Sequence, residues 1–310
     1  MIDVVVVGEI IFDITVNKFS CEMHRNKLTI TDRAARFSGG GDAQNASTTM
    51  GNLGLSVYLS GRVGEDEAGE MCLSMTEKAG VNCSRVVRAA EGVTATSVNL
   101  VGLDGEASHV CYPGENIRFS TEDVPFDLFS QAKFVSLHSL LAQPRLDVNR
   151  IFREARRNGA KTFADTTPTR GNENIGMLEE TLPLLDVFAP SHSEISFLLG
   201  ISDPHAIADE LRARGVGLVA IKLGRSGCLV ADKDGAALIP AYETDVVNTT
   251  GAGDNFSAGF LYGMCRGHSK EHSARIGNAC GAITVSSLSS TGVVRSFDHV
   301  REFIASKKTL

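Results

Sequence analysis

Short apolar runs alternate with helix-compatible stretches along most of this 310-residue chain. Runs of the buried-strand type lie at 4–7, 56–60, 134–137, 161–164, 187–189 and 218–223. Helical stretches lie at 42–53, 66–78, 145–158, 193–199, 204–214 and 253–288, and the last of these breaks near 267–269. Strands and helices that alternate in this way are typical of a mainly parallel sheet covered by helices on both faces. We therefore predict an α/β fold with a mainly parallel central sheet.

Two segments interrupt this alternation. Residues 14–37 are polar and aperiodic, and residues 94–101 and 107–112 form two β-rich runs around a turn-like sequence at 103–106. We expect these segments to pair in a small sheet outside the main one, either as a lid over a cleft or as an insertion without a function. The predicted division is a core of residues 1–12, 38–92 and 117–310 and a β lid of residues 13–37 and 93–116.

The composition excludes several kinds of partner. Thirty basic and thirty-seven acidic side chains give a net charge of −7, without the basic footprint of a protein that binds nucleic acid or anionic lipid. The apolar N-terminus is too short to span a membrane and lacks the basic region of a signal peptide. The seven cysteines are scattered and never spaced C-x-x-C, which indicates free thiols rather than disulfides or a structural metal. We expect a cytoplasmic protein with no nucleic-acid or membrane partner.

The most specific local signal is the string N-T-T-G-A-G-D-N-F-S-A-G at 248–259. At a helix N-terminus, the amides of Gly251, Ala252 and Gly253 would be open to a phosphate or a developing oxyanion. Asp254 in the same turn can accept a proton from a hydroxyl that attacks this phosphate, and phosphoryl transfer requires this combination. The alternative is an aspartate that only caps a helix.

A second glycine cluster lies at 38–46. Gly40 and Gly41 allow close approach of the backbone, and Asp42 and Asn45 share one helical turn. Carboxylates and amides suit the vicinal hydroxyls of a sugar, and Asp13 can join them at the carboxyl end of the first strand. The alternative for Asp42 is a helix N-cap. A dinucleotide site does not fit, because the glycine run comes too late after the first strand.

Two further segments are candidates for the border of a nucleotide. The sequence I-K-L-G-R-S-G at 221–227 ends a strand and places Lys222 near phosphate, although taken alone it is a β-turn. The sequence S-H-S-E at 191–194 also follows a strand, so Glu194 is either a neighbour of a metal-bound phosphate or part of a surface helix start.

Taken in this order, the motifs resemble the ribokinase-like (PfkB) family of carbohydrate kinases over nearly the whole chain. The string at 248–259 matches the family's C-terminal signature, and G-G-D-A-Q-N at 40–45 matches its N-terminal glycine motif. The turn at 61–69 is similar to the family's G-x-V-G-x-D-x-x-G turn, and L-G-R-S-G at 223–227 to its L-G-x-x-G nucleotide loop. The resemblance implies a three-layer α/β/α ribokinase-like fold with a mainly parallel central sheet and a small β-sheet lid. It also implies ATP with Mg²⁺ and transfer of a phosphoryl group to a sugar.

The resemblance further implies a role for each matching residue. Asp254 would be the catalytic base, with an anion hole of Gly251, Ala252 and Gly253. The sugar would be held by Asp13, Gly40, Gly41, Asp42, Asn45 and, as in ribokinase itself, Asn116. ATP would be bordered by Lys222, Gly224 and Gly227, with Asn278 beside the adenine, Ser191 near phosphate and Glu194 as an indirect Mg²⁺ contact.

Three positions depart from the family pattern. In the N-x-x-E motif near phosphate and Mg²⁺, Ser191 stands in place of the amide. The carboxylate often found six positions before the base is Asn248 here, which argues against activation by a monovalent cation. The D-x-N-x-R motif of several fructokinase-like members is D-T-T-P-T at 165–169, so the sugar is harder to infer.

The sequence favours an ATP-dependent sugar kinase over two other hypotheses. A nucleoside kinase of the same family needs aromatic stacking near the lid, for which Phe19, Phe37 and Tyr112 are candidates. A non-catalytic relative would only bind a sugar or a nucleotide.

The identity of the sugar is left open by the motifs. The G-G-D form and the I-K-L-G loop favour keto-sugar or sugar-acid substrates, whereas Asn116 favours ribose. Arg118 and Arg170 are the arginines near the candidate positions for a substrate carboxylate. An exposed edge of the lid would also allow a homodimer.

Overall fold

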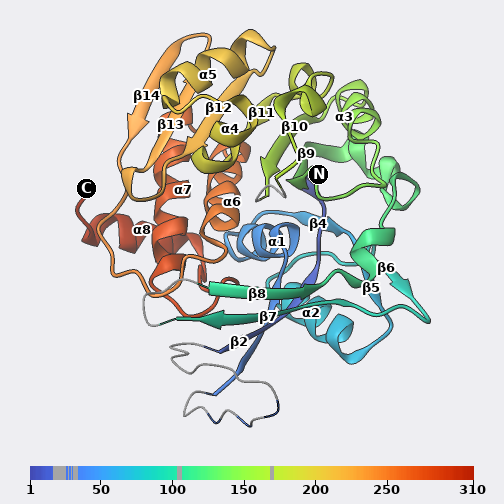
Figure 1. The fold of residues 1–310 in the computed structure, drawn as a ribbon. Helices are drawn as coiled ribbons and strands as arrows, with labels where there is room; N and C mark the ends of the chain where they lie inside the picture. The colour runs from blue at the N-terminus through green and yellow to red at the C-terminus, as the bar shows by residue number, and fades with distance from the viewer. Residues whose placement is uncertain (17–25, 27, 29, 31–33, 103–106, 168–170) are drawn as a thin grey trace.

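The computed structural model describes residues 1–16, 26, 28, 30, 34–102, 107–167 and 171–310. In this part of the chain the main sheet has eight strands (Figure 1). Their spatial order is β4 (Val57–Ser60), β1 (Ile2–Val7), β9 (Ala132–Leu140), β10 (Lys161–Thr166), β11 (Val187–Phe188), β12 (Leu218–Lys222), β13 (Cys228–Asp232) and β14 (Gly235–Ile239). From β4 to β12 all neighbouring strands are parallel, and β13 and β14 are antiparallel. The predicted mainly parallel sheet is confirmed.

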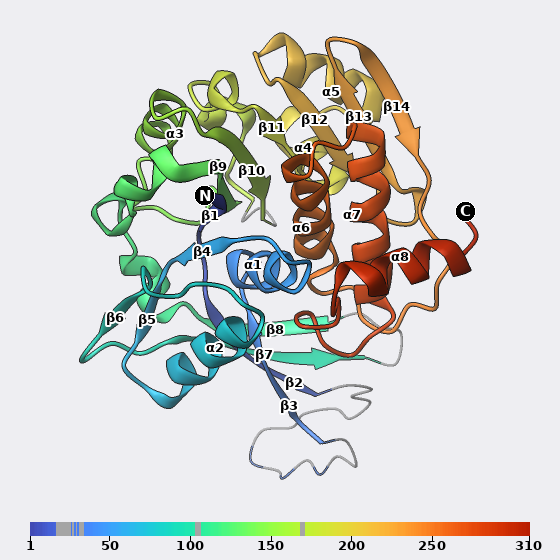
Figure 2. The same cartoon turned by 180° about the vertical axis from the view of Figure 1, so that it is seen from behind.

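Helices cover both faces of this sheet (Figures 1 and 2). Every residue of β1 is buried, and because successive side chains point to opposite faces, they enter two different cores. Val4 and Val6 belong to a core shared with α1 (Asp42–Asn52), α2 (Glu67–Lys78), α6 (Ala252–Cys265), α7 (Lys270–Val285) and α8 (Phe297–Ser306). Val5 and Val7 belong to the core on the other face, with α3 (Val148–Arg157), α4 (His192–Leu199) and α5 (Pro204–Ala213). The three-layer α/β/α arrangement is therefore confirmed.

A separate four-stranded sheet, here called the lid sheet, has the order β3-β2-β7-β8 in the described residues. Its strands are β2 (Ile11–Val16), β3 (Arg36–Gly40), β7 (Ala95–Val101) and β8 (Ala107–Tyr112). The two interrupting segments, which were expected to pair, thus do so through β2 and β7. Phe12 and Ile14 on one face of β2 pack into the core that contains α2. The division of the chain into a core and a lid stays a prediction, and the expected turn at 103–106 lies outside the described residues.

Several short elements were not expected from the sequence. The β13–β14 hairpin extends the main sheet, and β5 (Arg62–Gly64) pairs with β6 (Val87–Ala89). The hairpin has a local signal in Asp234-Gly235, whereas β5 and β6 are too short to show any periodicity. The 3₁₀ helices are η1 (Gly114–Arg118), η2 (Thr121–Asp123), η3 (Phe126–Gln131), η4 (Ile175–Leu178), η5 (Leu182–Leu184) and η6 (Gly224–Ser226).

The sequence also carried expectations about membrane-spanning helices and about the cysteines. No helix there is long and apolar enough to cross a membrane. The free thiols of this part of the chain are Cys72, Cys83, Cys111, Cys228, Cys265 and Cys280, of which Cys111 is exposed, and Cys21 lies outside it.

Candidate active site

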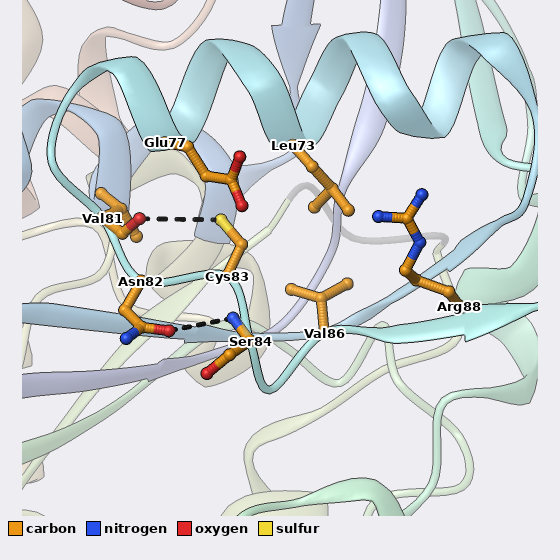
Figure 3. Close-up of a pocket in the computed structure, with 8 residues that line it drawn as sticks. All are labelled: Leu73, Glu77, Val81, Asn82, Cys83, Ser84, Val86 and Arg88. Carbon is orange, nitrogen blue, oxygen red and sulfur yellow. Dashed lines mark hydrogen bonds between the residues drawn. The ribbon is translucent and has the colours of Figure 1, made fainter.

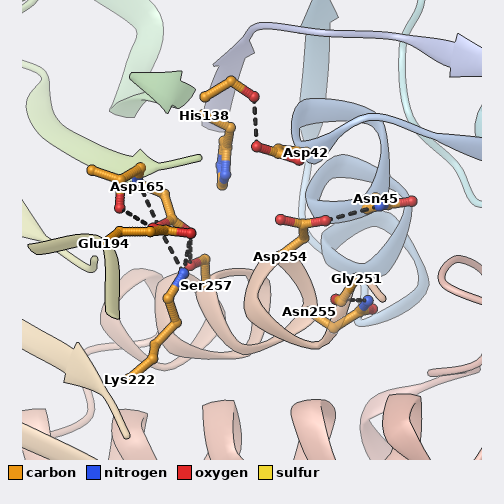
Figure 4. A network of polar contacts seen from close by, with 12 residues as sticks. Asp42, Asn45, His138, Asp165, Glu194, Lys222, Gly251, Asp254, Asn255 and Ser257 are labelled. Atoms are coloured by element: carbon orange, nitrogen blue, oxygen red, sulfur yellow. Dashed lines mark hydrogen bonds and ion pairs between the residues drawn. The ribbon is translucent and has the colours of Figure 1, made fainter. Parts of the chain in front are cut away.

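The two glycine clusters meet where α1 and α6 begin (Figure 4). Asp42 lies in the first turn of α1 and Asp254 in the first turn of α6. Asn45, one turn into α1, donates a hydrogen bond from Nδ2 to Oδ2 of Asp254 at 2.8 Å. This bond joins residues 209 positions apart in the sequence and connects the candidate base directly to the candidate sugar site.

Glycines, and not the aspartates, occupy the N-cap positions of both helices. Gly41 has a φ of 83°, and an added Cβ would lie 2.6 Å from the carbonyl oxygen of Glu9. Gly251 has a φ of 76°, and an added Cβ would lie 2.7 Å from the carbonyl oxygen of Ser290. Neither helix has a side-chain cap, so the alternative that Asp42 or Asp254 serves as a helix cap is wrong.

Asn255 fixes the turn that precedes α6. Its Nδ2 donates to the carbonyl oxygens of Gly251 at 2.7 Å and Ser290 at 2.9 Å, and its Oδ1 accepts the hydroxyl proton of Thr49. The fully buried side chain of Asn255 therefore holds the backbone that carries the amides of Gly251 to Gly253. Sequence reasoning assigned no role to Asn255, although it directly follows the candidate base.

Buried carboxylates determine the electrostatics of the site. Burial raises the pKa of Asp254 well above its usual range, and the carboxylate of Asp42 raises it further. Burial likewise raises the pKa of Asp42 to about 6, although the hydrogen bond that Ser139 Oγ donates to Asp42 Oδ2 at 2.6 Å lowers this pKa. A raised pKa makes Asp254 a stronger base than an ordinary carboxylate.

Asp13 approaches this group from the lid sheet. Its side chain is buried beside Gly40, where an added Cβ would lie 2.2 Å from Asp13 Oδ2. Burial raises the pKa of Asp13 to about 6, a hydrogen bond from Asn99 lowers it, and Asp42 raises it again. The structure thus brings Asp13, Gly40, Asp42 and Asn45 together.

Replacing Asp13 with asparagine should stabilise the free protein while removing a sugar ligand. A carboxyl group with a pKa of about 6 when folded and 3.8 when unfolded destabilises the fold above pH 6, by up to about 3 kcal/mol. This penalty shrinks as the pH falls from 6 towards 3.8 and vanishes below 3.8, where the group is protonated in both states. Urea unfolding of Asp13→Asn and wild type between pH 5 and pH 8 measures the difference, with the exposed Asp209→Asn as control. A stability gain that does not grow with pH would contradict the assignment.

A second group of charges lies at the carboxyl ends of β10 and β12 (Figure 4). Lys222 Nζ lies 2.7 and 2.6 Å from the two carboxylate oxygens of Asp165, and Ser257 Oγ donates to the same carboxylate at 2.6 Å. Burial alone would lower the pKa of Lys222, but Asp165 and Glu194 outweigh burial and raise it. An added Cβ on Gly253 would lie 3.2 Å from Lys222 Nζ, so this ammonium adjoins the amide turn of α6.

Glu194 is tied into this second group. Its Oε2 accepts the hydroxyl proton of Thr166, and burial raises its pKa. Glu194 is partly buried, so it is more than an exposed residue at the start of a surface helix. Ser191 forms an isolated parallel bridge with Lys222, which places it at the same edge of the sheet. Carboxylates fit Mg²⁺ when phosphate oxygens complete its shell, and Glu194 and Asp254 supply carboxylates here.

The remaining predicted residues have contacts of their own. Gly224 begins η6 and Gly227 is its C-cap, and an added Cβ on Gly227 would lie 2.0 Å from the carbonyl oxygen of Ile239. Asn278 Nδ2 donates to that carbonyl at 3.0 Å and to Pro240 at 2.9 Å, so Gly227 and Asn278 adjoin one backbone segment. Asn116 is buried with its amide paired to the backbone of Ile10, at 3.3 and 3.1 Å.

Asp165, Ser257 and His138 belong to the site without having been predicted as site residues. His138 is fully buried between the two charged groups, and burial lowers its pKa to about 4, which keeps the ring neutral (Figure 4). Its Nε2 lies 2.7 Å from Ser136 Oγ. The signals in the sequence were the segment D-T-T-P-T that begins at Asp165 and the polar pair His138-Ser139 at the end of an apolar strand.

A pocket of about 390 Å³ lies elsewhere, beside α2 (Figure 3). Its lining consists of Leu73, Glu77, Val81, Asn82, Cys83, Ser84, Val86 and Arg88. It shares no residue with the site at α1 and α6, and the predicted site residues do not line it.

Comparisons with known proteins identify the family and the fold. The family described as pfkB family carbohydrate kinase matches residues 1–295. An uncharacterized sugar kinase of Archaeoglobus fulgidus is 31% identical over 80% of this chain and 99% of its own length. An ATP-dependent ribose-1-phosphate kinase of Halopiger xanaduensis is 29% identical over 92% of each chain. The structure of Arabidopsis thaliana ribokinase complexed with ribose and ATP shares the fold, with a TM-score of 0.82 and 23% identity over 98% of this chain and 99% of its own.

Proposed function

The chain belongs to the pfkB family of carbohydrate kinases and is thus a phosphotransferase with an alcohol group as acceptor, and we propose that its acceptor is a small sugar or sugar acid. In this proposal the γ-phosphoryl group of ATP moves to a hydroxyl of the acceptor, and Asp254 is the general base. The hydrogen bond between Asn45 and Asp254 is the observation that carries the proposal, because it joins the sugar-binding cluster to the base.

Each group of residues in the site has its own role in the proposed reaction. Asp42, Asn45 and Asp13 accept and donate hydrogen bonds to the acceptor's hydroxyls, and Asp254 takes the proton of the attacking hydroxyl. The amides of Gly251, Ala252 and Gly253 and the ammonium of Lys222 stabilise the charge that develops on the transferred group. Gly224, Gly227, Asn278 and Ser191 would border ATP. Mg²⁺ would be held near Glu194, and it would neutralise phosphate charge.

The lid sheet favours a sugar over a nucleoside as acceptor. Phe37 pairs with Ile14, and Tyr112 with Thr96, so both aromatic side chains lie on the face opposite Asp13. Directly opposed residues of neighbouring strands share a face, and therefore neither ring can stack on a base held beside Asp13. Phe19 lies outside the described residues. Besides the ribose-1-phosphate kinase, relatives are named as kinases of sugars, sugar acids and a riboside, so these three classes belong in the test.

Release of ADP from ATP, measured over a panel of acceptors, tests the proposal. The panel contains ribose, fructose, tagatose, 2-keto-3-deoxygluconate and nucleosides. We expect turnover with a sugar or a sugar acid and none with a nucleoside. Binding without turnover across the whole panel would support a non-catalytic binding protein. Turnover of nucleosides alone would support a nucleoside kinase.

Turnover should not depend on potassium. Both polar atoms of the Asn248 side chain are hydrogen-bonded. Oδ1 accepts from the amide of Thr250 at 3.0 Å, and Nδ2 donates to the carbonyl oxygen of Leu288 at 3.2 Å. This neutral side chain closes the loop before α6 and offers no carboxylate to a cation. We expect equal rates in potassium, sodium and choline chloride at one ionic strength. The variant Asn248→Asp, which adds the carboxylate, is the matched comparison, and a potassium requirement in the wild type would contradict the prediction.

We also propose that two copies associate through the lid sheet, whose outer strands β3 and β8 each have one neighbour in the described residues. Sedimentation at several protein concentrations measures this association.

A further inference from the structure

The strand register places two rows of side chains on the face of the lid sheet that carries Asp13. The first row runs across the four strands as Ser38, Asp13, Ser97 and Cys111. The second row runs across the same strands as Arg36, Thr15, Asn99 and His109. Opposed residues share a face, and residues two apart on one strand share it too, so both rows belong to one surface.

Asn99 connects the two rows. Its Nδ2 donates to Thr15 Oγ1 at 3.4 Å, and its side chain also hydrogen-bonds the carboxylate of Asp13. Its Oδ1 accepts from Ser97 Oγ at 2.7 Å and lies 2.7 Å from His109 Nδ1. An amide oxygen only accepts, so Nδ1 of His109 carries a proton, and Nε2 is the nitrogen left for a ligand.

The second row ends in two basic side chains. Its middle members, Thr15 and Asn99, are buried and neutral, whereas Arg36 and His109 at its two ends are exposed. Arg36 forms no ion pair with any residue that the structure describes. Arg62, by contrast, is paired with Glu115 at 2.5 Å.

The charges of the site follow one another in a fixed order. Asp42 and Asn45 share the first turns of α1, Asn45 hydrogen-bonds Asp254, and Gly40, two residues before Asp42, adjoins the carboxylate of Asp13. The second row lies beyond Asp13, two residues further along each strand, which is about 7 Å. Carboxylates thus surround the reacting end of the acceptor, and Arg36 and His109 lie at the far end. A chain of five or six carbons can bridge the two.

We propose, on the basis of the proposed kinase function, that the acceptor carries an anionic group at the end away from the reacting hydroxyl, and that Arg36 and His109 bind this group. The planar guanidinium of Arg36 matches the oxygens of a carboxylate or a phosphate, and His109 Nε2 donates to the same group when the ring is protonated. Asn99 is a positioning residue, because it orients the His109 ring and the Asp13 carboxylate at once.

Matched acceptors test this assignment. Ribose is compared with ribose 1-phosphate and ribose 5-phosphate, and glucose with gluconate and 2-keto-3-deoxygluconate, in assays of ADP release. We expect the wild type to prefer the anionic member of one set, which identifies the group as phosphate or carboxylate. Arg36→Ala should lower kcat/KM for that acceptor by about 10- to 150-fold, mainly through KM, because a hydrogen-bonded charge is lost. His109→Ala should act in the same direction, and neutral sugars should not distinguish the variants from the wild type.

The control is Arg153→Ala on α3, an exposed arginine on the other side of the main sheet, which should leave every acceptor unchanged. The inference is wrong if neutral and anionic acceptors are used equally well, or if Arg36→Ala weakens all of them alike. Thermal shifts of wild type and Arg36→Ala with each acceptor measure binding without turnover. If no acceptor is phosphorylated but anionic ones stabilise only the wild type, the proposed function fails and the anionic site stands.

Discussion

Asp254→Asn should lower turnover by about 10²- to 10⁴-fold, which is the contribution of a positioned general base. The substitution removes the carboxylate but keeps its shape, and an oxygen remains to accept the hydrogen bond from Asn45 Nδ2. The turn of Gly251 to Gly253 is held by Asn255 rather than by Asp254, so the amides that face phosphate should keep their positions. We therefore expect the loss in kcat with little change in the binding of ATP.

The measurement is ADP release at saturating acceptor, together with a titration of ATP on the same variant. The exposed Asp298→Asn on α8 is a matched control, since it makes the same chemical change on the surface. Turnover close to that of the wild type would show that Asp254 is not the base. Loss of ATP binding together with turnover would instead assign Asp254 to the nucleotide.

Lys222→Met should destabilise the fold and also abolish efficient transfer. Lys222 and Asp165 are an almost completely buried ion pair, with side chains 10% and 2% exposed. Removal of one partner leaves the other charge buried without compensation, which typically costs about 3–5 kcal/mol. In this variant Ser257 and the amide of Thr166 would still contact Asp165.

The double variant Lys222→Met/Asp165→Asn separates the two effects. Because it removes both charges, we expect it to recover most of the free energy of unfolding measured by urea. Turnover should stay low, since the ammonium beside Gly253 is still missing. A double variant that regains turnover along with stability would show that Lys222 is structural and has no part in charge stabilisation.

The parts of the site that could be predicted are those encoded within one stretch of sequence. Small residues before an aspartate at a helix start are visible locally, and the strings at 40–45 and 248–259 each lie at a helix N-terminus in the structure. Asp165 and Lys222 could not be paired in this way, because their contact depends on strands β10 and β12 being close in the sheet. The alignment of Arg36 with His109 depends on the register of four strands, which the sequence does not encode locally.

Two asparagines show the limit of transferring roles from a family pattern. The side-chain amides of Asn116 and Asn278 are both engaged by backbone groups in the structure, at Ile10 and at Ile239 and Pro240. A buried amide that lacks partners is costly, so these bonds stabilise the fold irrespective of any ligand. Their roles toward sugar and adenine stay predictions, whereas their roles in shaping the backbone follow from the contacts.

The exposed thiol in the first row of the lid sheet is a site for a fluorescent label that reports acceptor binding. Cys111 shares that row with Asp13, whereas the other described thiols are buried. Burial, with Glu9 and Asp13, raises the pKa of Cys111, so its alkylation should be slow at neutral pH and faster in alkaline buffer. In a Cys21→Ser background, a fluorophore attached at Cys111 would lie on the surface where the acceptor is expected to bind. Acceptor binding can then be followed in real time without ATP and with Asp13, Arg36 and His109 unchanged.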